Sequence, residues 1–254
     1  MWTDLDGSVY STSAVGLGIC WAQCWDAVLV GLGIVDAPTI RKVQPVSLGA
    51  TAYKAQRDKI LLAEAYHKVA RLLRHFRQRC TEAGVTYQAR QEVGSPAECL
   101  LLEAPRYDLI LLGQQTFVHF ETQDKPDDTL HAVVKQSPCP VVTVPATLPE
   151  GRAVVVAYNG SPHATRALHM FQALGLDRAY DVHVVCIDTQ QKRAACWAEH
   201  AMAFLRGHNI VAQAHALGTS AGAAEVLLEQ VHTLAAGLIV MGAYGRSLAA
   251  HQRT

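Results

Sequence analysis

The stretch Leu109–Gly113, which reads LILLG, decides the fold of this chain because it returns as Leu238–Gly242, which reads LIVMG. Each is a short apolar run ending in glycine, which is typical of a strand covered on both faces of a sheet. The two runs lie at equivalent places in two longer segments that match each other. We therefore interpret the chain as two copies of one unit.

Two further matches support this duplication, and they occur in the same order along the chain. Asp6–Ser8 (DGS), followed by a helix rich in small residues, returns as Asn159–Ser161 (NGS). Val93–Leu101 (VGSPAECLL) returns in part as Gly222–Leu228 (GAAEVLL). Self-similarity in a fixed order indicates a repeated structural unit, whereas chance similarity of apolar strands explains one match at most.

The predicted domains are residues 1–146 and residues 151–254, and Pro145–Arg152 is the predicted linker. Within each domain, short apolar runs alternate with longer amphipathic stretches. This alternation predicts an α/β fold with a doubly wound parallel sheet in each domain. The predicted strands are Asp26–Val35, Val85–Glu92, Leu109–Gly113, Val141–Val144, Ala153–Ala157, Val182–Ile187, Ile210–Leu217 and Leu238–Gly242. The predicted helices are Lys59–Ala83, Pro96–Glu103, Leu130–Gln136, Ser161–Leu174, Gln191–Arg206 and Ala221–Leu234.

The charge balance argues against a protein that is basic or acidic as a whole. Lys plus Arg equals Asp plus Glu at 22 each, and half of the residues are apolar. This balance predicts neither a nucleic-acid partner nor a membrane partner. The densest basic stretch comprises Lys68, Arg71, Arg74, Arg77 and Arg79. It is either an anion-binding stripe or a solvated helix face, and we favour the solvated face.

The cysteines and the N-terminus predict a cytoplasmic protein. Seven cysteines, an odd number, are spread without a framework, as expected for reduced thiols. Cys20 and Cys24 lie about one helical turn apart, but no second pair accompanies them, so we predict no metal site. The first residues lack a secretory pattern, and no apolar stretch reaches the ~18 residues that a membrane span needs.

Taken together, these residues resemble the universal stress protein family. The resemblance rests on Asp6–Ser8 at the end of the first strand, the small-residue helix after it and the Gly-Ser-Pro-Ala-Glu helix start before Leu109–Gly113. The most specific part is Ser137–Val142 (SPCPVV), because family members typically close with a helix and a Pro-Cys-Pro-Val strand. The resemblance covers nearly the whole chain except Pro38–Arg57, and it implies a tandem member with two such domains.

The resemblance implies a Rossmann-like sheet of the adenine nucleotide alpha hydrolase type, with strand order 3-2-1-4-5. The second domain would lack its last helix and strand, since the sequence stops at Thr254. Some family members bind ATP at the carboxyl ends of strands 1 and 4, where such sheets open a crevice. Their loop there reads Gly-x-x-Gly, nine residues, then Gly-Ser or Gly-Thr. Glycines let the backbone approach phosphates, and a helix N-terminus supplies amide donors.

The first predicted domain, which is unit one of the duplication, departs from that loop. It keeps the acidic residue Asp6 and the first glycine, Gly113, but Thr116 replaces the second glycine. The later Gly-Ser pair would fall at Asp127 and Asp128, where two carboxylates would repel a phosphate. We therefore expect no phosphate binding in unit one, where Asp6–Ser8 could be a simple turn and helix cap.

Unit two keeps the first half of the loop, with Gly242 and Gly245. Its strand-1 residue is Asn159, which retains a hydrogen-bond acceptor without the charge. These glycines could also form a tight turn that binds no ligand. By resemblance, the remaining residues at the crevice would be Ala157, Tyr158, Cys186 and Met241.

The leading functional hypothesis is a non-catalytic stress-response binding protein with weak or degenerate binding of ATP or another adenine nucleotide. One alternative is a nucleotide hydrolase or transferase of the same α/β class, for which His119 and Asp124 lie in the loop after strand 4. Another is a protein-interaction module that has lost its ligand. The expected partners are an adenine nucleotide and, through the edge strand Leu238–Gly242, a second copy or the chain's other domain.

Overall fold

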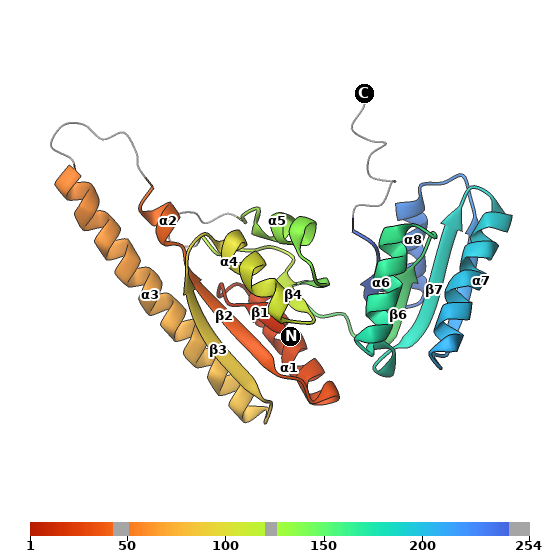
Figure 1. Cartoon of the computed structure of the whole chain (residues 1–254), viewed down its shortest axis with the longest axis horizontal. Coiled ribbons are helices and arrows are strands. Elements are labelled where there is room, and N and C mark those ends of the chain that lie inside the picture. The colour runs from red at the N-terminus through yellow and green to blue at the C-terminus, as the bar shows by residue number, and fades with distance from the viewer. Residues whose placement is uncertain (43–50, 120–125, 244–254) are drawn as a thin grey trace. The chain divides into compact units, whose positions relative to one another are not determined.

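The computed structural model describes residues 1–42, 51–119 and 126–243. Contacts within the chain divide it between Leu148 and Pro149 into two compact units, which we call unit one and unit two (Figure 1). Each unit is an α/β sheet with its own helices, and each is described separately below.

Unit one contains a five-stranded, all-parallel sheet with the order β3-β2-β1-β4-β5. Counted along the chain, this order is 3-2-1-4-5, which confirms the fold class expected from the sequence. The first strand, β1, lies in the middle of the sheet. The chain adds β2 and β3 on one side of it and then β4 and β5 on the other. The strands are β1 (Trp2–Asp4), β2 (Leu29–Val35), β3 (Tyr87–Val93), β4 (Ile110–Gly113) and β5 (Val141–Val144).

Helices cover both faces of this sheet. On one face, Leu29 and Val35 of β2 pack with Phe76 from the long helix α3, together with residues of α1. On the other face, Val30, Leu32 and Ile34 of the same strand pack with α4 and α5. This alternation explains why the apolar runs are continuous, because neighbouring residues point to opposite, equally buried faces. The helices are α1 (Val9–Trp25), α2 (Ala37–Ile40), α3 (Thr51–Glu82), α4 (Pro96–Glu103) and α5 (Thr129–Gln136), with a 3₁₀ turn at Ala104–Arg106.

Unit two repeats this arrangement with a parallel sheet ordered β8-β7-β6-β9. Counted within the unit the order is 3-2-1-4, so the four strands match the first four of unit one. Among the described residues of unit two there is no fifth strand. The strands are β6 (Ala153–Ala157), β7 (Asp181–Asp188), β8 (Ala212–Gly218) and β9 (Ala236–Val240). The helices are α6 (Pro162–Ala173), α7 (Gln191–Gly207) and α8 (Ala223–Thr233), with a 3₁₀ turn at Leu176–Arg178.

Several element boundaries differ from the sequence prediction. The second strand begins at Leu29 rather than Asp26, because Asp26 ends α1 in a left-handed conformation with φ 50°. The long helix begins at Thr51, eight residues before the predicted start at Lys59. The short helix α2 was not predicted; Asp36 caps it by accepting the Thr39 amide at 3.1 Å.

Each unit buries one thiol completely. Cys80 packs in the core of unit one, where burial raises its pKa to about 11. Cys186 is fully buried in β7 of unit two, where burial raises its pKa to about 12. All seven cysteines are unpaired. None of the helices in the described ranges is long and apolar enough to cross a membrane.

Candidate functional site

Both units form the same turn at the carboxyl end of their first strand. In unit one, Asp6 Oδ1 accepts the Ser8 amide at 2.8 Å, and Ser8 then caps α1. In unit two, Asn159 Oδ1 accepts the Ser161 amide at 3.1 Å, and Ser161 caps α6. A side-chain oxygen that bonds the amide two residues on makes an Asx turn, which Asp and Asn form equally well. The turn places a helix N-terminus beside the strand end in each unit.

A glycine at the end of the fourth strand lies against this helix start in both units. A Cβ at Gly113 would lie 2.6 Å from the Cβ of Tyr10 in α1. A Cβ at Gly242 would lie 2.6 Å from the carbonyl carbon of His163 in α6. Glycine therefore permits a close approach of backbone segments that no other residue allows here. This close approach lies at the carboxyl ends of the first and fourth strands, where the family resemblance implies a crevice.

In unit one, the loop after β4 turns back onto the carboxylates at this position. The Phe117 amide donates to Asp6 Oδ2 at 2.8 Å. The Val118 amide donates to Asp127 Oδ2 at 2.9 Å. These are charge-assisted hydrogen bonds when the carboxylates are ionised, and they hold the loop against the strand ends. The amides of Phe117 and Val118 are therefore already satisfied within the chain.

The second carboxylate oxygen of Asp127 also accepts hydrogen bonds from this loop. Its Oδ1 accepts the Thr116 hydroxyl at 2.6 Å and the Thr129 amide at 3.0 Å. Its own amide donates to the Thr116 carbonyl at 2.9 Å. The sequence predicted that a carboxylate here would repel phosphate. The structure adds that this carboxylate organises the loop and the start of α5.

Asp4, the last residue of β1, adds a second buried carboxyl group to that of Asp6. It is 4% exposed, and its Oδ1 has no hydrogen-bond partner. Burial, reinforced by the nearby carboxylates of Asp6 and Asp127, raises the pKa of Asp4 well above its usual value. Burial also raises the pKa of Asp6, although the amides of Ser8 and Phe117 oppose this shift. The strand ends near Asp4 and Asp6 are therefore a poor place for a further negative charge.

The structure also brings His119 to Asp36, which follows β2, through a short contact between Nδ1 and Oδ2. Burial alone would raise the pKa of Asp36, but hydrogen bonds from His119 and Thr39 hold that pKa below its usual value. The same contact raises the pKa of His119. The sequence singled out His119 but missed Asp36, whose signal is an aspartate directly after a buried strand. Asp124, predicted as a partner of His119, lies outside the described residues.

The predicted site residues of unit two lie at the carboxyl ends of β6, β7 and β9. Asn159 is exposed, Ala157 is half-buried and Tyr158 is buried, with its amide donating to the Val185 carbonyl at 3.0 Å. Cys186 is fully buried in the sheet, backbone included, so it presents no exposed surface to a ligand.

The two remaining predicted positions follow β9. Met241 is 56% exposed, and Gly242 lies against the N-terminus of α6. Gly245 lies outside the described residues. The sheet thus brings Asn159 and Gly242 to neighbouring strand ends, because β6 and β9 pair in parallel. Contact of these residues with a nucleotide stays a prediction.

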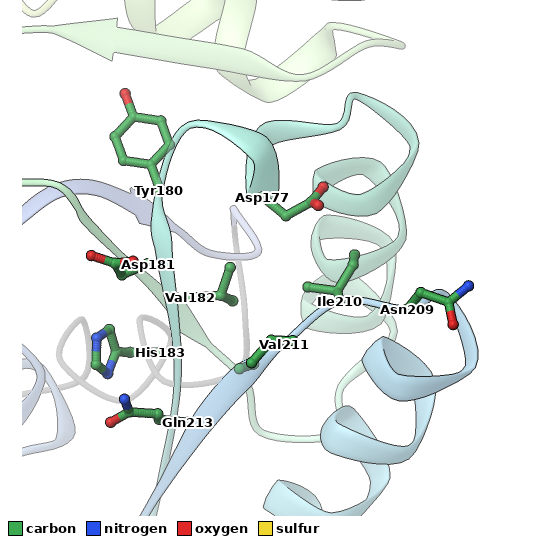
Figure 2. Close-up of a pocket in the computed structure, with 10 residues that line it drawn as sticks. Asp177, Tyr180, Asp181, Val182, His183, Asn209, Ile210, Val211 and Gln213 are labelled. Atoms are coloured by element: carbon green, nitrogen blue, oxygen red, sulfur yellow. The ribbon is translucent and has the colours of Figure 1, made fainter.

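A separate cavity of about 270 Å³ lies at the opposite, amino-terminal ends of β7 and β8 (Figure 2). Asp181, His183 and Gln213 line it beside the apolar residues Val182 and Ile210. His183 Nδ1 lies 3.0 Å from His215 Nε2 on the neighbouring strand. Across residues 1–42, 51–119 and 126–243, no three His, Cys, Asp or Glu side chains converge as metal ligands.

Comparison with known proteins identifies the fold. No protein-family model matches the sequence, and no curated protein matches it. The structure is similar to a universal stress protein from Archaeoglobus fulgidus, with a TM-score of 0.67, 16% identity and coverage of 94% of this chain and 85% of that chain. It also matches a universal stress protein from Lactobacillus plantarum (TM-score 0.44, 19% identity, 57% of this chain and 97% of that chain). A third match is a universal stress protein family protein from Arabidopsis thaliana with AMP bound (TM-score 0.36, 17% identity, 57% and 91%). The chain therefore has the universal stress protein fold, and this likeness extends over both units.

Proposed function

We propose that this chain, whose fold is that of the universal stress proteins, is a non-catalytic binding protein in which unit two takes an adenine nucleotide and unit one does not. One observation carries the proposal. In unit one, Asp6 and Asp127 accept the amides of Phe117 and Val118, which a phosphate would otherwise use. In unit two, the equivalent of Asp6 is Asn159, which is exposed and bears no charge.

The chemistry at unit two suits a nucleotide in three ways. The N-terminus of α6 presents the positive end of the helix dipole, although Pro162 has no amide hydrogen and the Ala164 amide already donates to Ser161 Oγ. Gly242 has no side chain, so the end of β9 packs directly against His163 at that N-terminus. Asn159 offers a carboxamide that can donate as well as accept, as a ribose hydroxyl requires. The adenine class of the ligand comes from the resemblance to the universal stress proteins.

A binding experiment with reciprocal variants tests this assignment. Labelled ATP is titrated into the wild-type protein, into Asn159→Ala and into Asp6→Ala. We expect saturable binding by the wild type, about tenfold weaker binding by Asn159→Ala, which corresponds to a loss of about 1.4 kcal/mol, and a change of less than about twofold for Asp6→Ala. Absence of saturable binding by the wild type, or loss of binding in Asp6→Ala alone, contradicts the proposal.

The contact between His119 and Asp36 favours a second candidate, a nucleotide hydrolase or transferase acting at unit one. An imidazole oriented by a carboxylate can act as a general base. The engaged amides of the neighbouring loop argue against a phosphate there, which is why we rank this function second. ATP turnover that exceeds a heat-inactivated control and disappears in His119→Ala would reverse the ranking.

Self-association is a third part of the proposal. The strand β9 is one of the two edge strands, with β8, among the four strands described in unit two, and an unpaired strand edge can bind another strand. We propose that this edge pairs within a dimer and that the protein acts in the cytoplasm, as its unpaired thiols suggest. A monomer at high concentration in sedimentation equilibrium would contradict the dimer.

A further inference from the structure

The charges of unit one are segregated, although the chain as a whole is neutral. Helix α3 carries five cations between Ala65 and Thr81 and no Asp or Glu in that interval. Helix α1, which shares the same face of the sheet, has no charged residue from Val9 to Trp25. The surface formed by these two helices is therefore basic, although the net charge of the whole chain is zero.

The structure shows which of these cations point to solvent. Arg71, Arg74 and Arg77 are exposed, while the buried stripe of α3 runs through Val69, Leu73 and Phe76 on the opposite side. Residues three apart on a helix form a row inclined to its axis, with neighbouring Cβ atoms about 5–6 Å apart. The three arginines thus form one diagonal row that rises about 9 Å along the exposed side.

These three arginines have no acidic partner among the described residues. The ion pairs present there belong to other cations, for example Arg90 and Arg106 with Glu103, and Arg193 with Asp188. Arg79, in contrast, donates to the Thr12 carbonyl at 3.1 Å and so joins α3 to α1. The row is available to an external anion, since no internal carboxylate neutralises it.

We propose that the exposed side of α3, through Arg71, Arg74 and Arg77, binds the phosphate backbone of a nucleic-acid duplex without reading its base sequence. Arginine suits this role because its planar fork binds phosphate oxygens in pairs. A row of cations matches a row of phosphates, and contacts to phosphates carry no sequence information.

The burial of α3 favours nucleic acid over a lipid surface. A helix that lies in a membrane interface must insert its apolar side. Between Val69 and Cys80, the apolar side of α3 is occupied by the sheet, where Phe76 is 2% exposed and Val69 is fully buried. Along this segment the exposed side is the polar, charged one, and a duplex requires no more than that.

The salt dependence of binding gives a quantitative test. Each phosphate contact contributes about −0.9 to the slope of log K against log salt concentration. We expect the full-length protein to bind a 20-base-pair duplex of mixed sequence with a slope of about −2.7, which weakens binding about 40-fold between 50 and 200 mM salt. The combined variant Arg71→Gln, Arg74→Gln, Arg77→Gln should lose nearly all of this slope, and fluorescence anisotropy measures it.

A charge-matched control removes three exposed cations of unit two, Arg166, Arg178 and Lys192, each to Gln. This control should keep the wild-type slope. Should the triple variant of α3 fail to fold, single variants should each reduce the slope by about 1. Equal losses in the control, no duplex binding at 20 mM salt, or binding to phosphatidylserine vesicles without binding to the duplex would each overturn the proposal. Titration with labelled ATP is independent of this result, because the row lies outside the nucleotide site proposed above.

Discussion

The amide of Phe117 donates to Asp6 Oδ2 at 2.8 Å, which joins residues 111 positions apart in the chain. This one bond ties the loop after β4 to the turn after β1. It also leaves the Phe117 amide with a partner inside the chain.

Replacing Asp6 by Asn should loosen the loop of unit one. The amide side chain offers one acceptor oxygen, so it can keep the Ser8 amide but not also the Phe117 amide. We expect the free energy of unfolding of unit one to fall by about 1–2 kcal/mol and exchange of the Phe117 amide to accelerate. The reciprocal change Asn159→Asp should shift unfolding by less than about 0.5 kcal/mol, because its turn needs one acceptor. Denaturant unfolding with hydrogen-exchange mass spectrometry measures both, and equal effects at the two positions would refute this prediction.

Replacing Asp4 by Val should stabilise unit one at neutral pH. The carboxyl group is buried with one oxygen unpartnered, and an apolar side chain removes that desolvation cost. We expect a gain of about 1–3 kcal/mol.

The pH dependence of this gain has a definite sign. The folded pKa of Asp4 is raised above its ordinary value of 3.8, so its contribution to stability is largest below that value and is lost as the pH rises through the folded pKa. The advantage of Asp4→Val should therefore grow with pH. Asp4→Asn should remove the pH dependence without the full gain, and a gain for Asp4→Val that is constant from pH 3 to pH 8 would contradict the shift.

The imidazole of His119 should titrate above its ordinary pKa of 6.5, because the Asp36 carboxylate accepts a hydrogen bond from its protonated Nδ1. The pair stabilises the fold fully between the ordinary pKa values of the two groups, 3.8 for Asp36 and 6.5 for His119. Stability is lost on both sides, as the carboxylate is protonated at low pH and as the imidazole is deprotonated at high pH. NMR titration of the His119 ring measures this midpoint. Asp36→Asn should return it toward 6.5, and a wild-type midpoint at or below 6.5 would exclude the ion pair.

The two equivalent turn glycines should tolerate alanine differently. Gly7 and Gly160 have φ of 82° and 71°, so a Cβ is strained at both, at a cost of about 1 kcal/mol. At Gly7 the added Cβ meets the flexible end of Leu72 at 3.1 Å, whereas at Gly160 it meets the ring of Trp197 at 2.4 Å. We expect Gly160→Ala to cost at least about 1 kcal/mol more than Gly7→Ala. Comparison of denaturant midpoints decides this, and equal midpoints would mean that the ring moves aside freely.

The sequence predicted the fold well because the fold depends on local patterns. Continuous apolar runs such as Leu109–Gly113 require a sheet covered on both faces, and their alternation with helices requires parallel strands. Element ends were less predictable. The start of β2 depends on the left-handed Asp26, and α2 depends on a cap by Asp36, neither of which leaves a periodic signal.

The candidate site was only partly predictable, because it depends on contacts between distant residues. The sequence placed Asp6, Asp127 and Gly242 near strand ends, where parallel strands bring their neighbours together. It could not indicate that Asp127 would accept bonds from Thr116 and Val118, since those depend on the path of a loop without regular structure. The pairing of Asp36 with His119 joins residues 83 positions apart and was missed for the same reason.

Each unit contains one fully buried thiol, and the reaction of that thiol reports the opening of its own unit. Because Cys80 and Cys186 have pKa values of about 11 and about 12, almost no thiolate exists at neutral pH while the units stay folded. Alkylation at either position therefore counts only molecules whose surrounding core has opened. Since Cys80 belongs to unit one and Cys186 to unit two, a single labelling experiment read by peptide mass separates the opening of the two halves without any engineered probe.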